Sequence, residues 1–587
     1  MKKLLECISD EVMNAFEAAG YKREAGKVTV SNRPDLCEYQ CNGAMALAKE
    51  AHCAPIQIAN AVAEKLQGNK VISKAEAVMP GFINMFINED FLANYVAQMA
   101  ASDRFGMEPA DKKMIVVDYG GPNIAKALHV GHLRPAIIGE SIKRILRYAG
   151  HEVIGDVHMG DWGKPMGLVM TEIQERQPNL PYFDENYTGE YPSEPPFTVK
   201  DLEEIYPTAS AKSKEDADYN ARALEATLKL QSGVRGYRAL WDHIINVSVN
   251  DMKRIYKILN VDFDLWNGES TVQYLIADMV KKMKDDGYAY ESDGAIVVDV
   301  KEETDTKEVP PCIILKSDGA SLYNTTDLAT IEERVIKYNP DQIIYITDKR
   351  QDLYFLQVFR CAKKTKLCDE NVTLSHIGFG TMNGKDGKPF KTRDGGVKRL
   401  EELIGDIQAE MYKKISENKD MDDAEARNTA NIVGLSALLY GDLSNQAVKD
   451  YIFDIDRFIS FEGNTGPYIL YTIVRIKSIL EKYKAQGGNM EAAKIGNPRN
   501  ASEKDLMKAL TGFAQTLESA SEELAPHKIC AYIYELANAL NSFYHETKIL
   551  SEEDEQAKSE YIALIDFTKE VLETCINLLG FEAPERM

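Results

Sequence analysis

Two histidines and a lysine form the group of side chains best suited to binding phosphate. His129 and His132 stand in the run His-Val-Gly-His, and Lys126 precedes His129 by three residues. An imidazole N–H donates hydrogen bonds to phosphate oxygens, and the lysine ammonium adds a compact positive charge. Gly131 has no Cβ and therefore leaves room for a flat base. The pattern predicts a nucleoside triphosphate site, and the alternative is an ordinary helix start with two exposed histidines.

The residues around this run form a strand, a loop and a helix. An apolar run over 114–117 ends at the Gly-Gly-Pro of 120–122, and apolar residues then recur at helical spacing over 133–146. A second strand begins at Val153, so the unit is a β-α-β motif of a parallel sheet. Such sheets bind ligands at the carboxyl ends of their strands, and free N–H groups at a helix start favour an anion.

A wider stretch of sequence carries a family resemblance. The segment from Asp118 to Arg134 reads DYGGPNIAKALHVGHLR, and HMGDWG follows from His158. These runs closely resemble the ATP-binding motif of class I aminoacyl-tRNA synthetases, specifically of arginyl-tRNA synthetases. The resemblance extends over nearly the whole chain. It implies an arginine–tRNA ligase that joins L-arginine to arginine isoacceptor tRNAs through an arginyl-adenylate, with ATP as substrate and Mg²⁺ accompanying the ATP.

The resemblance also implies two overlapping sets of residues at the ATP site. The histidines donate to the phosphates, the glycine between them admits adenine, and the lysine neutralises developing charge. The second basic loop of class I enzymes, usually KMSKS, corresponds here to GKDGKPFKTRDGG. Because this loop lacks the KMSKS sequence, we favour Lys126 over Lys391 for the role of its lysine. The alternative interpretation of the loop is a glycine-rich surface turn with solvated charges. The implied catalytic residues are His129, His132, Lys126 and Lys391, and the implied ATP-binding residues are these four with Gly131 and Arg393.

A pocket for arginine needs carboxylates, because a guanidinium stays charged and offers five donors in a flat fork. Tyr323 and Asp327 stand four residues apart at the start of a helix and can share one face, and Asp118 closes the first strand. For Asp118 and Asp327 the alternative role is capping of a turn or of a helix start. The resemblance places the guanidinium on these three residues and the backbone end of the amino acid on Asn123 and Gln351.

Three domains are predicted. Residues 1–110 form a small α/β module that resembles the family's additional N-terminal domain, which contacts the tRNA elbow. Residues 111–400 form a Rossmann-type catalytic domain with a doubly wound parallel sheet, interrupted by an insertion at about 172–290. Residues 401–587 carry long amphipathic segments and form an all-α bundle that resembles the family's anticodon-binding domain.

The parallel sheet is expected to continue beyond the insertion. Strand patterns alternate with helical ones there, as a parallel sheet requires. The expected strands are 295–300, 312–316, 342–347 and 376–379.

Composition restricts the class of protein further. At 587 residues the chain is too long for one core, and no apolar run approaches the ~18 residues that cross a bilayer. Nine cysteines without a CxxC pair predict a reducing compartment, and so a cytoplasmic protein. We also expect a monomer. No metal site is predicted, since no common zinc spacing fits Cys37, Cys41, His52 and Cys53.

The net charge of −23 would by itself argue against a polyanionic partner. Locally the balance reverses: residues 111–150 carry seven Lys and Arg against three Asp and Glu, and residues 377–399 carry six against two. A basic cleft on an acidic body can still bind nucleic acid. Two alternatives to the ligase remain. A non-catalytic RNA-binding relative is disfavoured by the intact histidine and pocket residues, and a small-molecule nucleotidyltransferase would not need the helical C-terminal domain.

Overall fold

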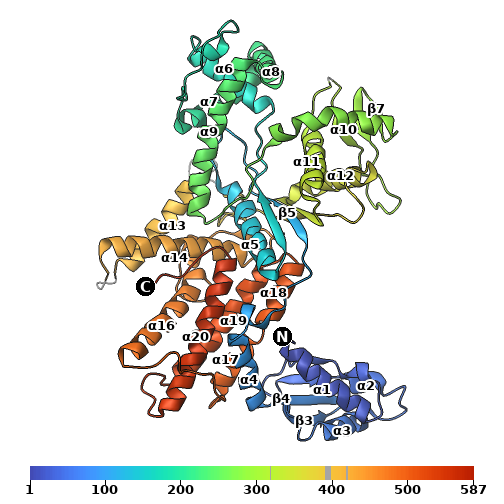
Figure 1. The fold of residues 1–587 in the computed structure, drawn as a ribbon, viewed down its shortest axis with the longest axis vertical. Helices are drawn as coiled ribbons and strands as arrows, with labels where there is room; N and C mark the ends of the chain where they lie inside the picture. The colour runs from blue at the N-terminus through green and yellow to red at the C-terminus, as the bar shows by residue number, and fades with distance from the viewer. Residues whose placement is uncertain (318, 391–397, 418–420) are drawn as a thin grey trace.

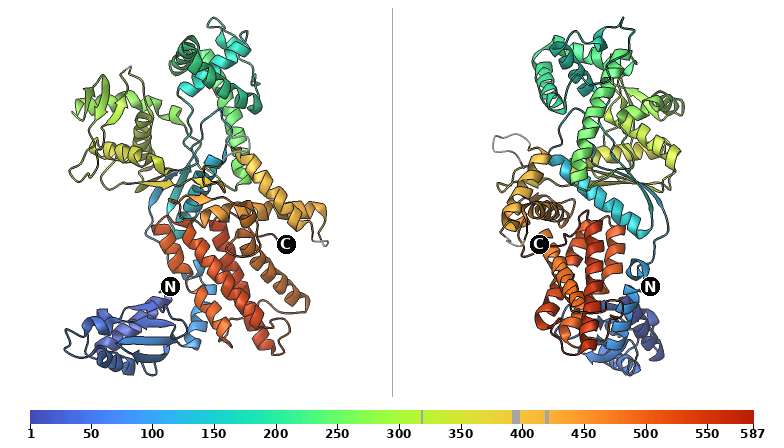
Figure 2. Two further views of the ribbon diagram at one scale, coloured as in Figure 1. Left: turned by 180° about the vertical axis from the view of Figure 1, so that it is seen from behind. Right: turned by 60° about the vertical axis from the view of Figure 1, so that its left-hand side comes forward.

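The computed structural model describes residues 1–317, 319–390, 398–417 and 421–587. The molecule is elongated: the N-terminal domain and the helical bundle lie at one end, and the helices of the insertion lie at the other (Figure 1). The central sheet lies between these ends, as the view from behind also shows (Figure 2).

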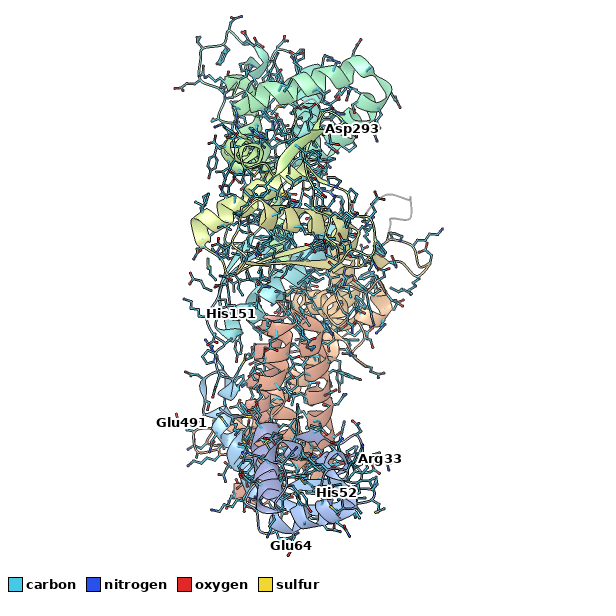
Figure 3. The ribbon with its side chains drawn as sticks, turned by 90° about the vertical axis from the view of Figure 1, so that its right-hand side faces the viewer. Arg33, His52, Glu64, His151, Asp293 and Glu491 are labelled. Carbon is cyan, nitrogen blue, oxygen red and sulfur yellow. The ribbon has the colours of Figure 1, made fainter. Side chains whose placement is uncertain are left out.

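The N-terminal domain combines a four-stranded antiparallel sheet, in the order β1-β2-β4-β3, with three helices. Ile8, Val12 and Phe16 recur at helical spacing on α1 and are fully buried, which fixes this helix on the domain. Figure 3 shows the domain, with His52, at the opposite end of the molecule from Asp293. Its elements are α1 (Leu4–Ala18), β1 (Val28–Val30), β2 (Tyr39–Cys41), α2 (Gly43–Leu47), α3 (Pro55–Lys65), β3 (Ile72–Val78) and β4 (Phe82–Ile87), and α4 (Glu89–Ala100) leads out of it.

The central sheet is parallel and has the strand order β11-β10-β5-β6. From β5 the chain moves to β6 on one side, and from β10 it moves to β11 on the other. The strand order therefore reverses between β5 and β10, where open α/β sheets bind their ligands. The Rossmann-type fold class is confirmed. The elements are β5 (Met114–Asp118), α5 (Leu133–Ala149), β6 (Glu152–Asp156), α11 (Tyr323–Tyr338), β10 (Gln342–Asp348), α12 (Asp352–Lys364) and β11 (Thr373–Phe379).

Two strands expected in this sheet lie elsewhere. β8 (Ala295–Val298) and β9 (Cys312–Leu315) pair antiparallel in a separate sheet with β7 (Ala289–Ser292). The turn between β7 and β8 consists of Asp293 and Gly294 with φ of 49° and 80°, the geometry of a tight hairpin. The connection from β8 to β9 holds no helix, so it cannot make the crossover that parallel neighbours need. The expectation for 295–300 and 312–316 was therefore wrong.

The insertion is a group of helices that extends away from the sheet (Figure 1). Its longest helix, α9, buries Leu240, Ile244, Met252 and Ile255 at helical spacing. The helices of this group are α6 (Lys164–Arg176), α7 (Val199–Glu215), α8 (Ala217–Gln231) and α9 (Arg235–Ile258). Helix α10 (Gln273–Asp285) lies apart from them and packs on β7 and α11 (Figure 1).

The C-terminal part of the chain is a helical bundle, as its amphipathic segments predicted. A buried ion pair joins it to the catalytic domain: Arg134 Nε on α5 lies 3.1 Å from Asp442 Oδ2 on α14. None of the helices in the described residues is both long and apolar enough to cross a membrane. The principal helices are α13 (Leu400–Ile415), α14 (Asp423–Leu443), α16 (Gly466–Ala485), α17 (Ala501–Leu510), α18 (Phe513–Glu522), α19 (Pro526–Glu546) and α20 (Glu555–Leu578).

Candidate active site

A cavity of about 840 Å³ opens at the carboxyl ends of β5, β6 and β10, where the strand order reverses. It brings together eight of the residues predicted from the sequence, although they come from distant segments of the chain. Those eight residues are Asp118, Asn123, His129, Gly131, His132, Tyr323, Asp327 and Gln351.

The two histidines are held by the backbone around them. The backbone N–H of His129 donates to Nδ1 of His132 at 3.0 Å, and the N–H of Gly131 donates to Nδ1 of His129 at 3.1 Å. Each Nδ1 is therefore an acceptor, so the proton of each neutral ring is assigned to Nε2. The rings lie 4.0 Å apart between centroids.

Both histidines are neutral at physiological pH. Burial lowers the pKa of His129, and the charge of Lys126 lowers it further. Burial lowers the pKa of His132 to about 3. Two neutral imidazoles therefore present Nε2–H groups as donors without carrying charge themselves.

Gly131 is required by the position of the His129 side chain. A Cβ at this position would lie 2.8 Å from Cε1 of His129, closer than real Cβ contacts allow. The glycine therefore makes room for the ring of His129, next to the turn Val130–His132 that opens helix α5. Its role towards adenine stays a prediction.

Asp118 is already bound to another residue of the chain. Nη2 of Arg334 donates to Oδ2 of Asp118 at 2.6 Å and to Oδ2 of Asp156 at 2.7 Å. Burial raises the pKa of Asp118 against the opposing effect of Arg334. Two buried carboxyl groups thus share one buried guanidinium beside the cavity. Arg334 and Asp156 were not anticipated from the sequence.

Tyr323 and Asp327 lie at the start of α11, with their side chains towards the cavity. Tyr323 is 64% exposed, whereas Asp327 is largely shielded and accepts a short hydrogen bond from the hydroxyl of Tyr354. Burial raises the pKa of Asp327. Glu269 is a third acid in the lining: burial, together with the charges of Asp161 and Asp327, raises its pKa to about 8.

The residues predicted for the backbone end of the amino acid lie at the same cavity. Asn123 pairs with Gly160, and a Cβ at Gly160 would lie 2.2 Å from Oδ1 of Asn123, so the glycine admits this amide. Gln351 is exposed at the turn before α12. His158 also lines the cavity, and its buried Nδ1 has no hydrogen-bond partner among the described residues.

The predicted cationic residues lie differently from the histidines. Lys126 is not part of the cavity lining; its ammonium lies 4.2 Å from the ring centroid of Tyr206 on α7. Lys391 and Arg393 lie outside the described residues.

The fold and the site define a class I aminoacyl-tRNA synthetase. The family model of the class I (R) tRNA synthetase catalytic domain matches residues 95–455. The DALR anticodon binding domain matches residues 469–587, and the arginyl tRNA synthetase N terminal domain matches residues 2–87.

The chain belongs to the arginyl-tRNA synthetase family. It is 62% identical over 597 residues to the arginine–tRNA ligase of Agathobacter rectalis and 57% identical over 588 residues to that of Alkaliphilus oremlandii, each covering 100% of both chains. Two solved structures share the fold. The arginyl-tRNA synthetase of Plasmodium falciparum has a TM-score of 0.81 at 23% identity, covering 100% of both chains. That of Thermus thermophilus has a TM-score of 0.74 at 21% identity, covering 99% of this chain and 100% of the other.

Proposed function

We propose that this chain, an arginine–tRNA ligase, binds ATP and L-arginine side by side in the cavity between β5 and β10 and transfers the arginine to tRNA. The observation that carries this proposal is that His129 and His132 line the same cavity as Asp118 and Asp327. Hydrogen-bond donors for phosphate and carboxylates for a guanidinium therefore face one shared space.

At the ATP end, Nε2–H of His129 and Nε2–H of His132 donate to the phosphates. Because both rings are neutral, they stabilise charge through oriented dipoles that are already in place before the reaction. Lys126 supplies a full positive charge from the rim, and Lys391 and Arg393 are proposed to add positive charge to the phosphates.

At the arginine end, the guanidinium binds between Asp118 and Asp327, and Tyr323 covers it. Asp118 presents its remaining acceptor capacity, because Oδ2 is occupied by Arg334. Asn123 and Gln351 hold the α-amino and carboxylate groups. A planar cation with five donors fits two acids held in fixed positions far better than an ammonium does.

The reaction needs no protein nucleophile. A carboxylate oxygen of arginine attacks the α-phosphorus of ATP, the bond to the bridging oxygen of the β-phosphate breaks, and pyrophosphate leaves with the electron pair. A ribose hydroxyl at the 3′ end of the tRNA then attacks the carbonyl carbon, the bond from that carbon to the phosphate oxygen breaks, and AMP leaves, its phosphate accepting the hydroxyl proton. The chain contributes positioning and charge stabilisation, as in other phosphoryl transfers.

Mg²⁺ is proposed to arrive with ATP and to neutralise phosphate charge. This ion prefers phosphates and waters to an all-protein cage, so the donor set required of the chain is small. Within the described residues, no group of three or more His, Cys, Asp or Glu is arranged to hold a metal.

The tRNA is proposed to contact the helical bundle and the N-terminal domain, which lie at the same end of the molecule (Figure 1). On the bundle, the guanidinium of Arg475 lies 4.9 Å from the ring centroids of Tyr471 and Tyr544, both partly exposed. Aromatic rings and an arginine in this arrangement suit stacking of unpaired bases. The N-terminal domain is proposed to contact the tRNA elbow. We further propose a monomer that works in the cytoplasm, where its nine free thiols stay reduced.

The test measures ATP–pyrophosphate exchange with arginine in the presence and absence of tRNA, alongside binding of labelled tRNA. We expect arginine-dependent exchange only when tRNA is present, because members of the family usually activate the amino acid on the tRNA complex. Binding of tRNA without any exchange or charging would favour the non-catalytic RNA-binding alternative.

A further inference from the structure

The insertion places the ring of Tyr206 beside Lys126, near the ATP site. Tyr206 on α7 lies under the ammonium of Lys126, with 4.2 Å between Nζ and the ring centroid. The pKa of Tyr323, at the cavity, is raised first by burial and then by Glu269 and Tyr206. Lys126 in turn lowers the pKa of both histidines, after the effect of burial.

An aromatic ring, unlike a carboxylate, does not neutralise the charge of a lysine that it contacts. Within the described ranges, no carboxylate lies at ion-pair distance from Lys126, and the lysine donates no side-chain hydrogen bond. A carboxylate would neutralise the lysine and would have to be displaced by phosphate. An aromatic ring attracts the ammonium but leaves its charge in place, so an arriving phosphate gains a free cation.

The helix that carries Tyr206 is also fixed to the segment beside the histidines. Glu203, on the preceding turn of α7, forms a short ion pair with Arg399. The N–H of Val130 donates to the carbonyl of Lys398 at 3.0 Å, and the N–H of Leu400 donates to the carbonyl of Leu128 at 2.9 Å. Residues 398–400 therefore connect α7 directly to the backbone of the His-Val-Gly-His run.

A second ion pair joins the insertion to the same segment. Arg254 on α9 donates from Nη1 and Nη2 to the two carboxylate oxygens of Glu401 at 2.6 and 2.9 Å. Two insertion helices thus contact the residues that flank the histidines, so the position of Tyr206 relative to the ATP site is set by several contacts.

From these contacts we infer that Tyr206 is a positioning residue for the first step of the reaction: its ring holds the ammonium of Lys126 at the entrance of the ATP site, where no carboxylate of the described residues pairs with it. This gives the insertion a role in catalysis, and it rests on the function proposed above for Lys126. Tyr206 touches no substrate and acts only through the lysine.

The test is a double-mutant cycle with Tyr206→Leu and Lys126→Ala, read out as kcat and KM in tRNA-dependent ATP–pyrophosphate exchange. Tyr206→Leu is expected to lower kcat about 10-fold, from the usual strength of a cation–π contact, with the KM for arginine unchanged. In the Lys126→Ala background, Tyr206→Leu is expected to have no further effect. Tyr206→Phe keeps the aromatic face and should restore the rate. Tyr290→Leu makes the same change on β7, far from the site, and serves as the matched control.

If Tyr206→Leu lowered kcat by the same factor in the wild type and in Lys126→Ala, the positioning role of Tyr206 would be overturned. The proposed function of Lys126 would be unaffected. A wild-type rate for Lys126→Ala would overturn both proposals. If Tyr206→Leu fails to fold by circular dichroism, replacement of Tyr206 by pentafluorophenylalanine keeps the ring volume and removes the attraction for a cation. A rate equal to that of Tyr206→Phe would then overturn the inference, and a loss of rate would support it.

Discussion

The guanidinium of Arg334 lies 2.6 Å from the carboxylate of Asp118, so one acid of the proposed arginine pocket already binds an arginine of the chain itself. Asp327 differs, because it accepts its hydrogen bond from the neutral hydroxyl of Tyr354. We therefore expect the two acids to act differently. Asp118 should support the folded sheet as well as bind the substrate, whereas Asp327 should act mainly on the substrate.

Asp118→Ala is therefore expected to destabilise the protein as well as raise the KM for arginine. It leaves Arg334 with Asp156 as its one carboxylate partner among the described residues, and breaking a buried ion pair costs roughly 3–5 kcal/mol. Denaturant unfolding followed by circular dichroism measures this loss. Asp456→Ala, at an exposed ion pair with Lys385, is the control and should leave stability close to that of the wild type. Equal stability of the two variants would show that the buried pair does not support the fold.

Asp327→Asn is expected to act on substrate binding instead. The amide keeps an acceptor for Tyr354 but removes the charge that faces the guanidinium. Hydrogen bonds to charged groups contribute about 1.5–3 kcal/mol, so the KM for arginine should rise roughly 10- to 100-fold while the unfolding midpoint stays near that of the wild type. Steady-state charging kinetics measure the KM. An unchanged KM would place the guanidinium elsewhere.

His132→Ala is expected to slow the first step. It removes one preorganised donor to the phosphates, which costs roughly 2.7–4 kcal/mol of transition-state stabilisation, or about 10²–10³ in kcat. His151→Ala is the matched control, because His151 follows the same helix and lies outside the cavity lining. Exchange kinetics that were slowed equally by both changes would contradict the assignment of His132.

The ionisation of Glu269 is expected to make the KM for arginine depend on pH. Its pKa of about 8 means that the carboxyl is protonated at neutral pH and gains a negative charge in the cavity as pH rises through about 8. Arginine is a cation, so its KM should fall from pH 7 to pH 9 in the wild type. Glu269→Gln cannot ionise and should remove this component of the profile, whereas the titration of free arginine affects both proteins equally. Identical profiles would rule out Glu269 as the group that titrates.

Strand β5, the loop after it and helix α5 could be predicted because the signals for them lie within one short stretch of sequence. The apolar run of β5, the glycines after it and the helical spacing of α5 are contiguous, and the run His-Val-Gly-His marks the start of the helix. The small N-terminal module and the helical C-terminal part were also predictable from spacing and from family resemblance.

The remaining features depend on contacts between distant residues. Arg334 stands next to Glu332 and Glu333 in the sequence, and nothing local marks it as a partner of Asp118. It lies seven residues after Asp327 and so shares its face of α11. The separate sheet was missed because β8 and β9 read like buried parallel strands; the Asp-Gly turn at 293–294 was the local signal for a hairpin.

Charging of arginine tRNA with each of the twenty amino acids in turn tests most directly whether this cavity is built for a planar cation beside ATP. The account predicts that the wild-type protein charges the tRNA with arginine and with none of the others. Charging with glutamate or cysteine in place of arginine would contradict it.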